Sequence, residues 1–439
     1  MLTGRPIGVW VWRIASAKPN LTIADQAIVS GTNFLTTVLI GRFAATSELG
    51  LYILGMSILI AIQCLQESLI TQPYTINRHK DVMTPAQHTG AALGLGAAFS
   101  VTSVLVIVAV ASGASRLDGN PEFIGLIWAL AGTAPFVLVR EFGRQMEFGH
   151  LNPTKALMMD FAAATTQIAA LAWLGWSGHM SAVTALAASA AGCAVAVAIW
   201  CSLFRRAAAF DKSRLPTATK QSWNLGKWFL ANQMVVVAQA NVSIWMLAAI
   251  AGTTDTGIYA ACVSVVSLAN PIILGLGNLL LAKAAASFKE GGRTRLRRDT
   301  RNDTLMLGAI MTLFAVPVSI FGNDIMRLVY PAQHYQNSSL IIAILATAQL
   351  VTAIATPAFN ALSAMDQVRL NFWIGLTATV LTTILLGMLV AKWGAVGAAW
   401  ALLAGAVMRC SARWCAFLVL SAQPRPCQGR ASRARHAAS

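Results

Sequence analysis

Residues 89–115 read TGAALGLGAAFSVTSVLVIVAVASGAS, a stretch without a charged side chain. About 20 consecutive apolar residues are enough for a helix that crosses a bilayer. Comparable uncharged stretches cover residues 228–254 and 370–391. The sequence is therefore that of a protein built from transmembrane helices.

The composition of the whole chain supports the same conclusion. Of its 439 residues 56% are hydrophobic and 11% are charged, whereas ordinary soluble domains are about a quarter charged. Lys and Arg outnumber Asp and Glu by 32 to 16, an excess that in membrane proteins marks cytoplasmic loops. The densest basic run, residues 293–301, has no interleaved aromatic residue for base stacking. We expect the partner of this chain to be the lipid bilayer and not nucleic acid.

Uncharged stretches and their polar breaks predict an all-α polytopic protein with about twelve spans in two sets of six. The spans are expected near residues 21–44, 49–73, 88–114, 122–143, 154–175 and 181–204, then 223–250, 256–282, 304–322, 338–362, 370–391 and 394–419. The corresponding domains are an interfacial N-terminal segment (1–20), a six-helix bundle (21–204), a basic cytoplasmic linker (205–222), a second six-helix bundle (223–420) and a disordered basic tail (421–439).

The distribution of Lys and Arg predicts the orientation of these spans. All but four of the 32 basic residues fall in segments that the division places on one side, and the exceptions are Arg42, Arg116, Arg327 and Lys392. Because positive charge concentrates in cytoplasmic loops, that side and both termini are predicted to be cytoplasmic.

An internal repeat relates the two halves at a constant offset of 207 residues. Asp25-Gln26 aligns with Asn232-Gln233, Glu48 with Asp255, and Gly50-Leu51-Tyr52 with Gly257-Ile258-Tyr259. Six spans separate the two copies, so both halves enter the membrane in the same direction. The bundles are therefore expected to be related by a pseudo-twofold axis along the membrane normal, with a substrate path between them.

Charged side chains lie at a similar depth within the first half. They are Asp25, Glu67, Arg140, Glu141, Arg144 and Asp160. Ionisable groups in a membrane usually face a cavity or a partner, so an inward-facing vestibule is predicted here. The alternative is that some of these groups lie at the membrane surface or pair with each other.

Energy coupling requires an ion-binding carboxylate, because the sequence contains no nucleotide-binding loop. Glu67, on the polar stripe that it forms with Gln63 and Gln66, is the first candidate for binding H+ or Na+. Asp25 and Asp160 are alternatives, and Glu67 could instead serve a structural purpose by pairing with Arg140. In the second half the predicted cavity residues are uncharged amides, namely Asn232, Gln239 and Asn241.

The opening of the chain carries a family resemblance. With Asp25-Gln26, Ser30-Gly31, Asn33-Phe34 and Gly50-Leu51-Tyr52, it resembles the polysaccharide transporters of the multidrug/oligosaccharidyl-lipid/polysaccharide exporter superfamily. The resemblance implies a V-shaped pair of six-helix bundles in the bacterial cytoplasmic membrane. Such a protein would flip an undecaprenyl-pyrophosphate-linked saccharide for surface polysaccharide synthesis, alongside other polysaccharide assembly proteins. The resemblance also makes Arg140 and Arg144 candidate pyrophosphate ligands.

Two other functions remain open. An ion-coupled multidrug exporter of the same superfamily would also have twelve spans and a twofold repeat. A membrane-embedded polysaccharide polymerase or ligase would need an active site, but the longest outer segment, about residues 322–337, leaves little room for one. The seven cysteines are scattered and show no metal-ligand spacing. We therefore expect a transporter without a cofactor or a structural metal.

Single-cysteine labelling tests the predicted orientation. In a cysteine-free background, Ser213→Cys and Gly292→Cys should resist an impermeant thiol reagent in intact cells, because both positions lie in predicted cytoplasmic loops. Gly119→Cys and Gly178→Cys, in predicted outer loops, should react. Labelling of Gly292→Cys from outside would reverse the assigned orientation, since the densest basic run begins at the next residue.

Overall fold

A computed structural model describes residues 7–77, 84–117, 120–150, 152–204, 209–210, 215–330 and 338–422. Within these ranges every regular element is helical, which confirms the all-α fold class. In chain order the elements are α1 (Ile7–Phe43), α2 (Thr46–Gln66), the π-helix η1 (Glu67–Thr71), α3 (Gln72–Asn77), α4 (Pro85–Arg116), α5 (Pro121–Gly149), α6 (Pro153–Trp176), α7 (Ala182–Leu203), α8 (Leu215–Ile250), α9 (Thr253–Val266), the 3₁₀ turn η2 (Ser267–Ala269), α10 (Asn270–Ile320), α11 (Gly322–Val329), α12 (Ser339–Ala364) and α13 (Val368–Ala422).

The helices correspond to the predicted spans, and the protein is a multi-pass membrane protein. Ten helices of the described chain are long and apolar enough to cross a membrane. The last of these, α13, contains two of the predicted spans, and α1, which is not among the ten, contains the first. Two helices begin at least eight residues earlier than the predicted spans, α1 at Ile7 and α8 at Leu215. The predicted tail from residue 423 onward lies outside the described residues.

Two glycines divide the longest helices into two arms each. Gly292 in α10 has φ 62° and Gly394 in α13 has φ 54°, a left-handed conformation that glycine adopts without steric cost. At the first bend the two arms of α10 run side by side, linked by Lys283 to Asp303 (2.5 Å) and by Glu290 to Arg295 (2.6 Å). The basic run after Gly292 is therefore the start of a helical arm and not an irregular loop.

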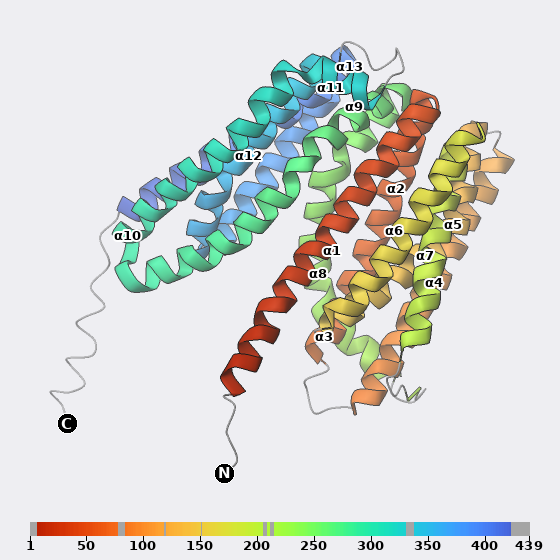
Figure 1. The fold of residues 1–439 in the computed structure, drawn as a ribbon, viewed down its shortest axis with the longest axis horizontal. Helices are drawn as coiled ribbons and strands as arrows, with labels where there is room; N and C mark the ends of the chain where they lie inside the picture. The colour runs from red at the N-terminus through yellow and green to blue at the C-terminus, as the bar shows by residue number, and fades with distance from the viewer. Residues whose placement is uncertain are drawn as a thin grey trace.

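The two halves of the chain form the arms of a V. Helices α1 to α7 pack mainly on one another, and α10, α12 and α13 form the other arm (Figure 1). The arms converge near α9 and α11 and diverge toward the start of α1 and the end of α13 (Figure 1). We call these the closed end and the open end. Helix α8 contacts both arms, because it packs against α2 and η1 as well as α13.

The closed end depends on a reciprocal contact between α2 and α9. A Cβ atom added to Gly50 would lie 1.9 Å from the carbonyl oxygen of Thr253, and one added to Gly257 would lie 2.0 Å from that of Thr46. The two backbones therefore touch where only glycine fits. Both pairs are related by the offset of 207 residues, so this contact follows the predicted twofold repeat.

Two acidic side chains that the repeat relates to each other accept hydrogen bonds at helix N-termini. The Glu48 carboxylate accepts a hydrogen bond from the backbone N–H of Ala182 at the start of α7 (2.6 Å). The Asp255 carboxylate accepts one from Ala395 at the start of the second arm of α13 (3.1 Å). Negative charge at a helix N-terminus is favourable because unpaired N–H groups point outward there. The aligned pair Glu48 and Asp255 thus has the same structural function in both halves.

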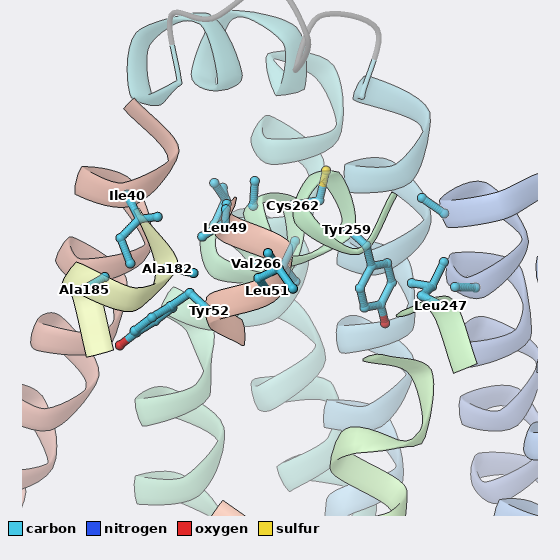
Figure 2. Close-up of a cluster of buried hydrophobic side chains, with 14 of the residues drawn as sticks. Ile40, Leu49, Leu51, Tyr52, Ala182, Ala185, Leu247, Tyr259, Cys262 and Val266 are labelled. Carbon is cyan, nitrogen blue, oxygen red and sulfur yellow. The ribbon is translucent and has the colours of Figure 1, made fainter. Parts of the chain in front are cut away.

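The largest hydrophobic cluster joins the halves below this contact. Figure 2 shows side chains of α2 and α9 in one cluster, together with residues of α1, α7 and α8. Leu49, Leu247 and Cys262 are fully buried. The core of this molecule therefore lies across the interface between the two bundles.

A short helix that the sequence analysis did not predict seals the closed end. The Arg42 guanidinium of α1 donates to the carbonyl oxygens of Leu328 (2.7 Å) and Val329 (3.0 Å) at the end of α11. Tyr330 follows directly, is 1% exposed, and lies with its hydroxyl 2.8 Å from that of Ser264 in α9. Its ring also fills the space beside Gly41. This segment therefore connects the first half of the chain to the second.

Substitution of the paired glycines tests the closed-end contact. Gly50→Ala and Gly257→Ala should each lower the stability of the purified protein by about 1–3 kcal/mol, the usual effect of overpacking a core. Thermal unfolding followed by tryptophan fluorescence measures this change. Gly125→Ala in α5 is the control, because an added Cβ there meets nothing within 4 Å. Equal unfolding temperatures for Gly50→Ala and Gly125→Ala would contradict the contact.

Candidate functional site

A pocket of about 240 Å³ lies between the two halves below the closed end. Its lining comes from α1, α2, α8, α9 and η2. The residues are Asn33, Phe34, Thr37, Tyr52, Ile53, Met56, Ser57, Ile60, Asn241, Ile244, Tyr259, Ala260, Val263, Ser264 and Ser267. This central pocket is in the position predicted for a substrate path.

The central pocket is symmetric in its construction. All of its lining residues except Asn33 form pairs separated by 207 positions: Phe34 with Asn241, Thr37 with Ile244, Tyr52 with Tyr259, Ile53 with Ala260, Met56 with Val263, Ser57 with Ser264, and Ile60 with Ser267. The repeat therefore places equivalent backbone positions on opposite walls. The chemistry of the two walls differs, because only Tyr52 with Tyr259 and Ser57 with Ser264 are identical pairs.

Most of the lining surface is apolar; its polar groups are hydroxyls and amides, and no lining residue is charged. Ser57 accepts a hydrogen bond across the interface from the indole N–H of Trp245 (2.8 Å). The hydroxyl of Tyr52 lies 3.3 Å from Ser189 in α7. The two tyrosine rings turn away from each other, each toward its own half (Figure 2). Such a pocket suits an uncharged polar group.

A cluster of charged side chains lies inside the first half, on α1, α5 and α6. Asp160 pairs with both Arg140 and Arg144, and the Arg144–Asp160 distance is 2.6 Å. Arg144 also contacts Asp25 at 2.8 Å and Glu141 at 3.1 Å. Asp25 and Asp160 are each 1% exposed. We call these five residues the charged cluster.

The charged cluster is not internally balanced. Three carboxylates face two guanidinium groups, and one Asp25 oxygen and the Arg140 Nε are buried without a hydrogen-bond partner. Burying unbalanced charge within a membrane protein is costly. One bound monovalent cation would neutralise the excess negative charge.

Of the predicted ion-coupling residues, Asp25 and Asp160 thus belong to one site. Glu67 begins the π-helix η1 and accepts a hydrogen bond from the Gln72 side-chain amide at 3.2 Å. It makes no ion pair with the described residues, so the pairing of Glu67 with Arg140 that the sequence left open is absent there. A π-turn often marks a functional position in a helix.

The predicted amides of the second half lie in different places. Asn241 lines the central pocket and donates to the carbonyl of Val237 (3.1 Å). Gln239 lines a neighbouring cavity within the second bundle and donates to the carbonyl of Gly375 (3.4 Å). The side chain of Asn232 lies outside the described residues.

Sequence reasoning missed several residues of these cavities. Tyr52 and Tyr259 served only as landmarks of the repeat, and Ser57 and Ser264 were not singled out. Arg409 was counted as a basic residue of the cytoplasmic side, whereas it lines the cavity within the second bundle. Span hydropathy shows how deep a residue lies but not which face of the helix points inward. The repeat register, applied to the whole of α1 and α2, was the signal that could have identified the pocket.

Comparison with known protein families and structures gives consistent results. The family described as "Polysaccharide biosynthesis protein" matches residues 21–281. No curated protein matches the sequence.

Solved structures share the fold. An inward-facing multidrug resistance MATE family transporter of the MOP superfamily superposes with a TM-score of 0.73 and 12% identity, over 89% of this chain and 94% of that one. An outward-facing MATE family transporter of that superfamily superposes with a TM-score of 0.61 and 12% identity, over 93% of this chain and 95% of that one. The lipid II flippase MurJ in an inward closed conformation superposes with a TM-score of 0.68 and 12% identity, over 92% of this chain and 90% of that one. The V of Figure 1 is thus more similar to the inward-facing than to the outward-facing MATE arrangement.

Proposed function

Because this chain belongs to the polysaccharide biosynthesis protein family and has the fold of MOP superfamily transporters, we propose that it flips a lipid-linked saccharide across the bacterial cytoplasmic membrane. The proposed substrate is a saccharide on an undecaprenyl-pyrophosphate carrier, destined for surface polysaccharide. The V opens toward the start of α1 and the end of α13 (Figure 1). With the predicted orientation this end faces the cytoplasm, and the protein in this conformation would receive substrate from there.

The chemistry of the central pocket is the observation that carries this proposal. The pocket is mostly apolar, its few polar groups are hydroxyls and amides, and no lining residue is charged. Sugar hydroxyls bond to such groups, and the apolar face of a sugar ring packs on aromatic side chains. A saccharide fits this lining better than a cationic drug, which would favour a carboxylate in the pocket.

The fold itself allows the multidrug exporter as a second candidate. The MATE neighbours share the two-bundle architecture, and the buried Asp25 and Asp160 could in principle bind a cation. Both carboxylates, however, are already engaged by Arg144. Their arrangement supports binding of a small coupling ion more than binding of an organic cation.

We further propose that the charged cluster binds the coupling ion, H+ or Na+. Binding of one cation would remove the net negative charge of the cluster. Asp25 is the best-placed residue, because it has a buried oxygen without a partner. Its helix α1 also lines the central pocket through Asn33 and Thr37 and holds the closed end through Arg42. A change of ion occupancy at Asp25 would therefore act on the helix that contacts both.

Deletion of the gene distinguishes the two transport functions. The proposed flippase predicts loss of surface polysaccharide and accumulation of its lipid-linked precursor on the cytoplasmic side, because synthesis continues while translocation stops. Mass spectrometry of extracted lipids and gel analysis of surface polysaccharide measure both effects. Normal polysaccharide together with increased drug sensitivity would favour the exporter. Translocated but unpolymerised precursor would favour the polymerase or ligase.

Neutral amide variants test the coupling site in reconstituted vesicles. Asp25→Asn should remove most of the dependence of flipping on an imposed H+ or Na+ gradient, because the amide cannot bind either ion as a carboxylate does. Glu67→Gln is the matched comparison on η1 and should retain gradient-driven flipping. The opposite result, with Glu67→Gln uncoupled and Asp25→Asn unchanged, would assign coupling to Glu67 instead.

A further inference from the structure

The second bundle contains a cavity of its own, with a volume of about 220 Å³. Ile244, Tyr259, Val263 and Ser267 line both this cavity and the central pocket, so the two adjoin. Its remaining polar lining comes from α8, α10, α12 and α13, and includes Gln239, Ser243, Asn270, Gln349, Thr352 and Arg409. We call it the lateral cavity.

Arg409 introduces positive charge at one side of the lateral cavity. Arg413 lies one turn further along the same face of α13. Its guanidinium carbon is 4.8 Å from the ring centre of Phe359 in α12, and its Nε is buried without a hydrogen-bond partner. Arg409 therefore lines the lateral cavity, and Arg413 packs on Phe359 one turn further along α13.

These two arginines lack an acidic partner in the described part of the chain. Of the acidic residues of the second half, Asp255 caps α13, and Glu290, Asp299 and Asp303 bond within α10. Asp324 and Asp366 are exposed. In the first half, by contrast, both Arg140 and Arg144 contact carboxylates. Unpaired positive charge within a membrane bundle is unfavourable. A bound anion would therefore stabilise the second bundle.

The donors around Arg409 match phosphoryl oxygens. Guanidinium groups bind phosphate through two parallel N–H donors, and the bond is stronger because both partners are charged. The amides of Gln239 and Gln349 line the same cavity, where Gln349 bonds to Asn270. The uncharged central pocket lies directly beside this cationic group, beyond Tyr259.

We propose that Arg409 and Arg413 form an anion site for the diphosphate group of the lipid-linked substrate, while the attached saccharide occupies the central pocket. This inference rests on the proposed flippase function. It places the diphosphate in the second half of the protein. Arg140 and Arg144, which the family resemblance suggested for this purpose, remain bound to Asp25 and Asp160.

Binding to purified full-length protein tests the site without transport. In nanodiscs of phosphatidylcholine, farnesyl diphosphate should raise the unfolding temperature, whereas farnesol and sulfate at matched ionic strength should not. The double variant R409Q/R413Q should bind farnesyl diphosphate at least about tenfold more weakly, since it loses the charge-assisted hydrogen bonds to the diphosphate. R409K/R413K keeps the positive charge but loses the two parallel N–H donors of each arginine, so its affinity should be intermediate. Binding by this variant shows that the protein folds when both positions are substituted.

The control variant R297Q/R298Q removes the same charge from exposed positions of α10 and should bind as wild type does. Equal binding by R409Q/R413Q and wild type would overturn the proposal. Stabilisation of wild type by phosphatidylglycerol nanodiscs but not by farnesyl diphosphate would also overturn it, and would assign the arginines to a phospholipid headgroup. The two proposals can fail separately. If farnesyl diphosphate binding depends on both arginines but deletion of the gene leaves surface polysaccharide normal, the anion site is confirmed and the proposed flippase function is contradicted.

Discussion

The contact between the backbones of α2 and α9 fixes the geometry of the whole molecule. Gly50 and Gly257 bring the two helices together, each against the carbonyl of the opposite helix start. This contact lies near the twofold axis, so it decides which residues face each other across the central pocket. Tyr52 and Tyr259, two positions further along each helix, consequently lie on opposite walls of that pocket. The hydrophobic cluster around them then joins both halves (Figure 2).

The two bundles share a backbone arrangement but differ in the charged side chains that they contain. The first bundle contains three carboxylates and two arginines in contact with one another. In the second, Arg409 lines the lateral cavity and Arg413 packs on Phe359, and neither has an acidic partner among the described residues. One half is therefore suited to a small cation and the other to an anion. A symmetric scaffold whose halves carry different charges offers separate places for two unlike ligands. Helix α1 contacts the charged cluster, the central pocket and the closed end, so it links these sites mechanically.

Much of this arrangement could be predicted from the sequence. Long uncharged stretches identified the helices, because lipid requires apolar side chains and internally paired backbones. The polar landmarks at offset 207 identified the twofold relation. The similar depth of Asp25, Arg140, Arg144 and Asp160 favoured a vestibule, whereas in the structure these side chains pair with one another, which the sequence left as the alternative. Hydropathy did not indicate α11, whose short amphipathic sequence looks like a loop. It also could not show that Arg409 faces a cavity, because that depends on the rotation of α13 about its axis, which tertiary packing determines.

The seal made by Arg42 has a consequence for evolutionary change in this protein. Among the described residues its guanidinium bonds to the main-chain carbonyls of Leu328 and Val329 and to no side chain, so these bonds do not depend directly on the identity of the α11 side chains. Substitutions in this helix can accumulate without loss of the seal, provided that the helix still ends at the same place. A single-residue deletion is different, because it would rotate the terminal carbonyls by about 100° away from the arginine. Selection should therefore conserve the length of α11 more strictly than its sequence.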